Sequence, residues 1–268
     1  MTRPILLVGA GRMGGALLKG WIARGIGPVV VVEPATSPEL RKVARAHRID
    51  VHATADSVRT RPRACVVALK PQVLRTEAAQ LTSFAQCGTL MISIAAGTTI
   101  KNLSRTWGRT ARIVRAMPNT PGAIGKGISA LFAGTKASAA DRKLSMKLLA
   151  PLGKTLWVKR EALIDSVTAV SGSGPAYVFL LVEALAEAAC HEGLPQAQAQ
   201  QLARATIVGA GALLEADNRS PTELRQAVTS PGGTTQAALD VLLAKDGLKP
   251  LIVRAVHGAR KRAEELGR

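Results

Sequence analysis

This sequence is poor in aromatic residues, in cysteine and in acidic residues. Phe, Trp and Tyr make up 3% of its 268 residues, and the three cysteines, Cys65, Cys87 and Cys190, lie far apart without a CxxC pair. A disulfide framework and a metal site are therefore not indicated, and the cysteine usage predicts a reducing, cytoplasmic location. The few aromatic rings also argue against base stacking with a nucleic acid.

Acidic residues are too few to balance the basic ones. Lys and Arg number 36 and Asp and Glu number 18, which gives a formal net charge of +18. This charge raises nucleic acid as a partner, but the basic residues are spread along the chain, with one modest cluster at 254–262. We interpret them as a solvated surface that attracts anionic cofactors and substrates, and we expect no nucleic-acid partner.

Long hydrophobic runs are also missing. The most apolar stretch, 176–190, is interrupted by Glu183 and Glu187. Because about 18 or more consecutive apolar residues are needed to span a bilayer, we predict no membrane partner.

A glycine-rich turn follows the first apolar segment. Residues 5–15 read ILLVGAGRMGG, so a short buried strand is expected to lead into Gly9, Gly11 and Gly14. In the dinucleotide-binding pattern the first glycine allows the tight turn, the second lets the backbone approach a pyrophosphate, and the third lets the next helix pack closely. That helix, expected over 15–24, would direct its free N–H groups at the phosphate. The cofactor-binding prediction here also includes Arg12 and Met13.

An acidic residue closes the second apolar run, 29–32. Glu33 lies 24 residues after Gly9, near the spacing of about 20 expected for a residue that binds the adenosine ribose. Its carboxylate would repel a 2′-phosphate, so NADH is favoured over NADPH. Arg12, Arg41 and Lys42 could each meet a phosphate, which leaves NADPH open.

The first half of the chain alternates strand and helix, which predicts an α/β fold with a mainly parallel Rossmann-type sheet covered by helices on both faces. Further strands are expected at 64–69, 89–94, 113–114, 128–133 and 154–158, and helices at 37–47 and 138–152. The carboxyl ends of parallel strands line the ligand crevice of such a sheet. The residues expected there to bind the cofactor are Ala68, Leu69, Lys70, Pro71, Ala95, Ala96, Gly97 and Asn119.

Helical periodicity replaces the strand pattern in the second half. Helices are expected at 175–192, 195–215, 220–228, 234–244 and 248–266. We place the domain boundary near Glu161, with a dinucleotide-binding domain at 1–161 and an all-helical substrate-binding and dimerisation domain at 162–268. Its Ala- and Leu-rich faces suit packing against a second copy of the chain.

Two turns in this half carry small residues and hydroxyls at the expected starts of helices. They are SGSGP at 171–175 and TSPGGTT at 229–235. Such a turn can bind a carboxylate through free N–H groups, or it can simply cap its helix. Because two of them occur beside a dinucleotide motif, we favour a small anionic substrate.

Six segments together resemble the pyrroline-5-carboxylate reductase family. They are GAGRMGG, VALKPQVL, ISIAAGTTI, RAMPNTP, AVSGSGPAYVFLLVEAL and VTSPGGTTQAAL, in this order along essentially the whole chain. The resemblance implies hydride transfer from NADH or NADPH to the C=N carbon of 1-pyrroline-5-carboxylate, which yields L-proline in the last step of proline biosynthesis. It also implies an interlocked homodimer, which can assemble into a ring of dimers.

The resemblance also implies roles for the residues of the second turn. Ser230, with the backbone N–H groups of Gly233 and Thr234, would hold the substrate carboxylate, and Gly232 belongs to the same substrate site. The Thr235 hydroxyl would bond the ring nitrogen, which makes Thr235 the catalytic candidate.

Two other functions are kept as alternatives. A β-hydroxyacid dehydrogenase would share the two-domain outline but would need a catalytic lysine on the helix expected at 175–192, which contains none. A non-enzymatic protein that binds dinucleotides or nucleic acid would leave the two turns with no role beyond capping.

Overall fold

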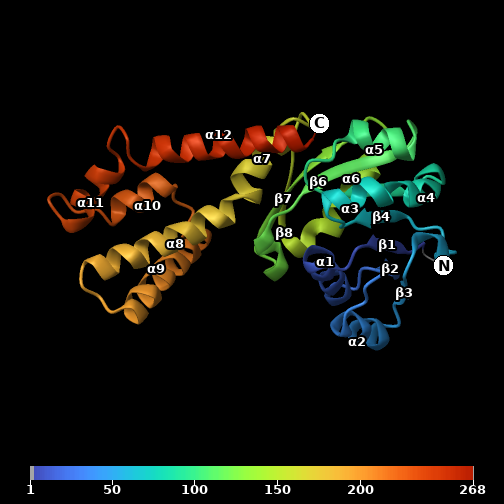
Figure 1. The fold of residues 1–268 in the computed structure, drawn as a ribbon, viewed down its shortest axis with the longest axis horizontal. Coiled ribbons are helices and arrows are strands. Elements are labelled where there is room, and N and C mark those ends of the chain that lie inside the picture. The colour runs from blue at the N-terminus through green and yellow to red at the C-terminus, as the bar shows by residue number, and fades with distance from the viewer. Residues whose placement is uncertain (1–2, 268) are drawn as a thin grey trace. The chain divides into compact units, whose positions relative to one another are not determined.

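The computed structural model describes residues 3–267. By its packing the chain divides into two units, drawn in Figure 1. The first extends to Gly172 and includes the chain from Ala259 onward, and the second is Ser173–Gly258. This division describes packing within one chain, and the domain boundary near Glu161 stays a prediction.

The first unit is built on one eight-stranded sheet. Its strands lie in the order β3-β2-β1-β4-β5-β6-β7-β8, and only the β6–β7 pair within this described sheet is antiparallel. The first six strands thus have the order of a doubly wound dinucleotide-binding fold, as predicted. The strands are β1 Ile5–Val8, β2 Val29–Val32, β3 Asp50–His52, β4 Ala64–Val67, β5 Leu90–Ser93, β6 Arg112–Met117, β7 Gly127–Ala133 and β8 Gly153–Trp157.

Helices cover both faces of this sheet, because the central strands are apolar on both sides. In β1, Ile5 and Leu7 pack in one hydrophobic cluster with α1, α2 and α6, whereas Leu6 and Val8 pack in another with α3, α4 and α5. The helices of this unit are α1 Arg12–Ala23, α2 Pro38–His47, α3 Pro71–Glu77, α4 Thr82–Gln86, α5 Ile100–Trp107, α6 Ala139–Leu149 and α7 Leu163–Val167.

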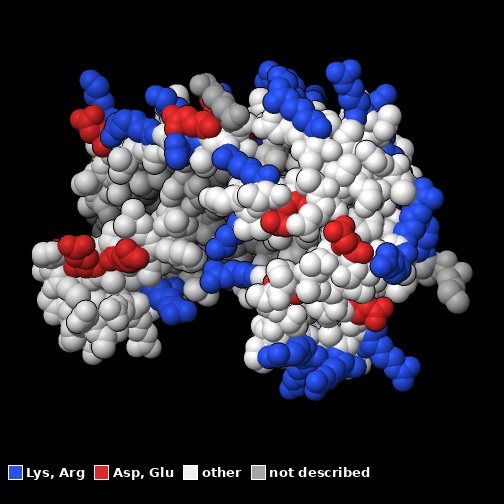
Figure 2. Space-filling view, turned by 45° about the vertical axis from the view of Figure 1, so that its right-hand side comes forward, with Lys and Arg blue, Asp and Glu red and all other residues white. Residues whose placement is uncertain are grey.

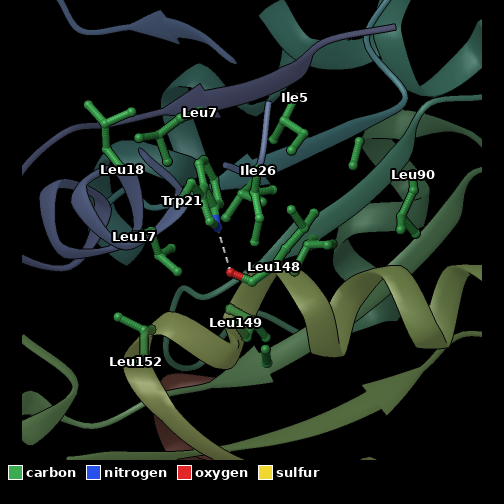
Figure 3. Close-up of a cluster of buried hydrophobic side chains, with 14 of the residues drawn as sticks. Ile5, Leu7, Leu17, Leu18, Trp21, Ile26, Leu90, Leu148, Leu149 and Leu152 are labelled. Carbon is green, nitrogen blue, oxygen red and sulfur yellow. Dashed lines mark hydrogen bonds between the residues drawn. The ribbon is translucent and has the colours of Figure 1, made fainter. Parts of the chain in front are cut away.

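A buried tryptophan anchors a helix on each face. Trp21 of α1 is 0% exposed and donates its indole N–H to the carbonyl oxygen of Leu148 in α6, 2.7 Å away (Figure 3). Trp107 of α5 donates in the same way to the carbonyl of Ala78, at 2.8 Å. Each ring therefore fills the core while its one polar group is hydrogen-bonded.

The helix starts follow the capping residues in the sequence. Ser37 accepts a hydrogen bond from the Leu40 N–H, and Ser138 forms a reciprocal capping box with Asp141. The short elements β3, α3, α4 and α7 were not predicted, because they span between three and seven residues and carry too little periodicity. β4 ends at Val67, two residues before the expected end at Leu69, and Pro71 opens α3 at a position where proline needs no N–H donor.

The second unit is helical, as predicted. It contains α8 Gly174–His191, α9 Gln196–Ala216, α10 Pro221–Ala227 and α11 Thr234–Leu242, and the last helix, α12 Leu248–Leu266, is divided between the units. α10 begins with the expected capping box, in which Ser220 and Glu223 bond reciprocally. These hydrogen bonds lower the pKa of the Glu223 carboxyl group.

Helix α8 is strongly apolar and little covered within the chain. The helical stretch Leu163–His191 is long and apolar enough to cross a membrane by length and composition alone, and 6% of its most apolar window is buried. Phe179 is 62% and Leu180 63% exposed. Length and composition do not distinguish a membrane span from a helix that another protein chain covers.

Basic residues dominate the charged surface, as the composition requires. Figure 2 shows Lys and Arg in several separate groups on the face that it draws, with Asp and Glu between them. This distribution agrees with the spread of basic residues along the sequence.

Candidate functional site

The glycine turn between β1 and α1 leaves no room for side chains at two of its positions. Gly9 has a φ of +89°, and a Cβ there would lie 2.9 Å from the Ala68 carbonyl oxygen. A Cβ on Gly14 would lie 2.0 Å from the Gly9 carbonyl oxygen, so α1 can pack this closely only on a glycine.

Gly11 differs from these two glycines, because a Cβ there would meet no atom within 4 Å. Gly11 is also the N-cap residue of α1, and no side chain caps this helix start. The start of α1 is therefore uncapped by a side chain, and the space beside Gly11 is open where the sequence predicts a pyrophosphate. The residues present fit a bound dinucleotide, with an open backbone approach at Gly11 between two sterically required glycines.

Glu33 follows β2 and lies directly on the glycine turn. Its Oε2 accepts a hydrogen bond from the Ala10 N–H at 2.7 Å, and its Oε1 accepts one from the Ala35 N–H at 3.1 Å. The spacing of Glu33 from Gly9 predicted a ribose-binding residue, and the bond to Ala10 has no counterpart in that prediction. The carboxylate thus holds the turn, and its contact with the adenosine ribose stays a prediction.

A cavity of about 290 Å³ lies beside the turn, between α1 and α2. Gly11, Arg12 and Ser37 line it together with Lys19 and Glu39. The last two form an ion pair at 2.6 Å, which holds the pKa of the exposed Glu39 carboxyl group below its ordinary value.

The three basic residues considered for a phosphate lie in different places. Arg12 lines this cavity, whereas Arg41 and Lys42 line a separate surface hollow with Pro38 and Arg45.

The other predicted cofactor residues lie at the same carboxyl edge of the sheet. Ala68 and Leu69, after β4, would be within about 3 Å of a Cβ on Gly9. Lys70 is the N-cap residue of α3. After β5, Ala95 is buried and Gly97 has a φ of +65°, where a Cβ would lie 3.2 Å from Leu266.

Asn119, after β6, has a structural partner that the sequence did not indicate. Its Oδ1 accepts a hydrogen bond from the Ile128 N–H at 2.9 Å, near the start of β7. A cofactor contact by this side chain would therefore fall to its amide nitrogen, and its cofactor role stays a prediction.

The turn before α11 opens a helix, as predicted. Gly233 is the N-cap residue of α11, and no side chain caps this helix start, whereas the Thr229 hydroxyl donates to the Arg225 carbonyl at 2.7 Å. Gly232 has a φ of +70°, in the left-handed region. The Gly233 N–H donates to the Ser230 carbonyl at 3.0 Å, which the sequence did not show.

The other turn, at 171–175, leads into a long helix as predicted, since α8 begins at Gly174 after the N-cap residue Ser173, but the residues before it are also helical. Thr168–Gly172 is wound as a π-helix directly after α7, and the helical winding continues with one bend at Ser173 into α8. The Ser171 hydroxyl donates to the Val167 carbonyl at 3.1 Å. Because the preceding residues are already helical, their carbonyl groups take up hydrogen bonds that a free helix start would leave to a ligand.

A buried arginine in β6 was not identified from the sequence. Arg115 of β6 is 2% exposed, and its guanidinium lies 3.2 Å from both the Glu161 and the Asp165 carboxylates. A basic residue in the middle of the apolar run 113–117 was the available signal, because a buried charge requires a partner.

The chain is similar along its whole length to known pyrroline-5-carboxylate reductases. A family model described as pyrroline-5-carboxylate reductase dimerisation matches residues 161–266, and one described as NADP oxidoreductase, coenzyme F420-dependent, matches residues 4–97. The pyrroline-5-carboxylate reductase of Pseudomonas aeruginosa is 36% identical over 266 residues, which cover 99% of this chain and 97% of that protein. The Arabidopsis thaliana enzyme is 35% identical over 97% of this chain and 94% of its own.

Solved structures give the same result. A pyrroline-5-carboxylate reductase from Coxiella burnetii superposes with a TM-score of 0.92 at 33% identity, with 100% of both chains covered. The Plasmodium falciparum pyrroline carboxylate reductase with NADP bound has a TM-score of 0.83 at 25% identity, over 99% of this chain and 98% of that one.

Gly11 and Gly14 provide a matched pair of substitutions. Gly11→Ala should fold with unchanged thermal stability, because its methyl group meets no protein atom. Since that methyl group would stand in the pyrophosphate path, we expect NADH to bind about tenfold more weakly, a change of roughly 1.4 kcal/mol. Gly14→Ala should instead lose about 1–3 kcal/mol of folding free energy through overpacking. Titration calorimetry measures the NADH affinity of each variant, and urea unfolding measures its folding free energy. An unchanged NADH affinity in Gly11→Ala would contradict this site.

Proposed function

This chain belongs to the pyrroline-5-carboxylate reductase family and is an NAD(P)H-dependent oxidoreductase, and on that premise we propose how its residues carry out the reduction of 1-pyrroline-5-carboxylate to L-proline. The observation that carries the function is the match at 36% identity over 99% of the chain. Both the glycine turn and the turn before α11 lie within that match.

The glycine turn and the neighbouring strand ends would hold the dinucleotide. Gly11 and the uncapped start of α1 support the pyrophosphate, and Glu33 lies where the adenosine ribose is expected. The loops after β4, β5 and β6 would line the remainder of the dinucleotide site. Bound there, the reduced nicotinamide supplies a hydride to the C=N carbon of the substrate.

NADH is the proposed preferred cofactor. A Glu33 carboxylate held 2.7 Å from the Ala10 nitrogen can accept hydrogen bonds from ribose hydroxyls, and its negative charge disfavours a 2′-phosphate beside it. Arg12 lines the adjacent cavity and is the residue that would meet such a phosphate if NADPH were used. One matching family model is described as an NADP oxidoreductase, which supports NADPH as the alternative cofactor.

The turn before α11 would hold the substrate. The substrate carboxylate would accept hydrogen bonds from the Ser230 hydroxyl and from the Thr234 N–H at the uncapped start of α11. Because the Gly233 N–H already donates to the Ser230 carbonyl, a carboxylate bond from Gly233 would require that turn bond to be shared. Gly232 allows the left-handed turn that precedes them.

Thr235 is the proposed catalytic residue. The protonated cyclic imine is already electrophilic, so the reaction needs orientation and charge placement more than a strong base. The Thr235 hydroxyl oxygen would accept a hydrogen bond from the ring N–H. That bond orients the C=N carbon toward the hydride, and the ring nitrogen keeps its proton as it becomes the amine of proline.

The helical second half is proposed to form a homodimer. Residues 161–266 match the family's dimerisation model, and α8 exposes Phe179 and Leu180 to solvent in the single chain. Covering such a surface with a second copy removes apolar area from water. We also propose that the dimers assemble into a ring. Separately, the cysteine usage supports a cytoplasmic location.

Sedimentation velocity tests the dimer. We expect a species of twice the chain mass or a larger even multiple. Phe179→Glu should shift the distribution toward monomer, because it places a charge in the contact. A wild-type protein that remains monomeric at micromolar concentration would contradict the proposed dimer.

Oxidation of NADH and NADPH on addition of 1-pyrroline-5-carboxylate tests the reaction and the role of Glu33. The wild type should use NADH with the higher kcat/KM. Glu33→Gln should raise the NADPH-to-NADH ratio of kcat/KM by about tenfold, or roughly 1.4 kcal/mol, because the amide still accepts the Ala10 bond but carries no charge.

Glu77→Gln is the control for that substitution. It removes one negative charge at the end of α3 away from the strand edge and should leave the cofactor ratio unchanged. An unchanged ratio in Glu33→Gln would refute the role of Glu33, whereas no oxidation of either cofactor by the wild type would refute the reaction.

Thr235→Ala should lower kcat about 10- to 100-fold, because a hydrogen bond to a charged group contributes roughly 1.5–3 kcal/mol. Thr235→Ser keeps the hydroxyl and should recover most of the activity. Thr234→Ala, whose proposed contact is a backbone N–H, should remain close to wild type. Kinetics of Thr235→Ala equal to those of the wild type would exclude the catalytic role.

A further inference from the structure

Arg115 places a permanent positive charge inside the hydrophobic sheet. Its neighbours in β6, Ile113, Val114 and Ala116, are each 0–1% exposed, and Arg115 itself is 2% exposed. A charge so deeply buried is costly unless it is paired.

Two carboxylates from one short segment pair with it. The Arg115 Nη1 lies 3.2 Å from Glu161 Oε1, and its Nη2 lies 3.2 Å from Asp165 Oδ1. Glu161 precedes α7 and Asp165 lies within it, so the guanidinium fixes both ends of this turn of chain against β6. We call Arg115, Glu161 and Asp165 the arginine cluster.

One oxygen of the cluster also reaches the cofactor edge. Glu161 Oε1 accepts a hydrogen bond from the Ile100 N–H at 2.7 Å. Ile100 is the first residue of α5 and comes directly after the loop 95–99, whose residues Ala95, Ala96 and Gly97 are proposed to contact the cofactor. The cluster therefore joins that loop to β6, two residues before Met117.

The cluster also holds the segment that leads into the second unit. α7 is followed at once by the π-helix Thr168–Gly172, and the first unit ends at Gly172. Single π-helical turns inside longer helices occur frequently at functional sites. Asp165 thus anchors the last regular turn before the chain enters the unit that carries the proposed substrate turn.

Stability alone does not account for this arrangement. Replacing a buried ion cluster by apolar residues of similar volume is often neutral or stabilising. By contrast, a displacement of about 1 Å at the reacting atoms can slow catalysis by about 100-fold. The contacts above reach both a cofactor loop and the segment that connects to the substrate-binding unit.

We propose that Arg115 and Glu161 are positioning residues for hydride transfer, which act by fixing the loop 95–99 and the start of the connecting helix. This inference rests on the proposed function, since it concerns the efficiency of that same reaction. Neither residue is assigned a contact with cofactor or substrate.

The test uses variants that separate positioning from folding. Glu161→Ala removes the acceptor for the Ile100 N–H, whereas Glu161→Gln keeps an oxygen that can accept it. We expect kcat to fall about 10- to 100-fold in Glu161→Ala and to return most of the way in Glu161→Gln, with the dissociation constant of NADH changing less than about threefold in both.

A triple variant, Arg115→Met with Glu161→Leu and Asp165→Leu, removes all three charges together. It should unfold at a temperature close to that of the wild type, because no charge is left unpaired. Its kcat should still fall, and 4-deuterated NADH should give a larger kinetic isotope effect than with the wild type, because the hydride step becomes slower.

Arg112→Met is the matched control. Arg112 opens β6 at its other end and pairs with Asp141 at 2.8 Å. Its loss should lower the unfolding temperature and leave kcat and the isotope effect unchanged.

The outcomes distinguish this proposal from the proposed function. A stable triple variant with wild-type kcat, or equal kcat values in Glu161→Ala and the wild type, would overturn the positioning role alone. If the triple variant does not fold, the Glu161→Ala and Glu161→Gln comparison decides. A wild type that oxidises neither NADH nor NADPH with 1-pyrroline-5-carboxylate would overturn both.

Discussion

The close approach of α1 to the end of β1 is the constraint on which the rest of the cofactor site depends. Only glycine fits at position 14, because an added Cβ would lie 2.0 Å from the Gly9 carbonyl oxygen. The close packing of Gly14 on Gly9 brings the start of α1 to the end of β1. Gly11 is then left facing open space, and Ala10 is left to donate to Glu33. Because the neighbouring strands run parallel, their following loops meet the turn at one edge.

Much of the fold could be predicted because its signals are local. Ser138 with Asp141 and Ser220 with Glu223 mark helix starts within four residues, and both boxes form. The long helices α8, α9 and α12 follow from periodicity over many residues. β3 is three residues long and π-winding at Thr168–Gly172 depends on the helix before it, so neither has a local signal of its own.

Features of the candidate site that depend on the spacing of residues along the chain could be recognised in the sequence. Features that depend on tertiary contacts could not. The glycine turn and Glu33 are recognisable from their order. The bonds of Asn119 to Ile128 and of Arg115 to Glu161 join residues 9 and 46 positions apart, and the Gly233 bond competes with a role expected for that N–H. Such partners are set by the packed structure, which the sequence pattern does not specify.

The two halves of the chain divide the work of the proposed reaction. In this proposal the sheet edge would hold the electron donor by backbone N–H groups and one carboxylate, and the turn before α11 would hold an anionic substrate by a helix start and hydroxyls. The proposed reaction needs no strong base, because its substrate is already an electrophilic protonated imine. The exposed apolar surface of α8 is available for the proposed contact between subunits.

The most direct test of this account is to run the reaction with NADH deuterated at C4 and to analyse the proline formed by mass spectrometry. Direct hydride transfer predicts one deuterium, at the ring carbon that was double-bonded to nitrogen, from one of the two faces of the nicotinamide. Proline that carries no deuterium from either labelled face, formed while the cofactor is oxidised, would contradict it.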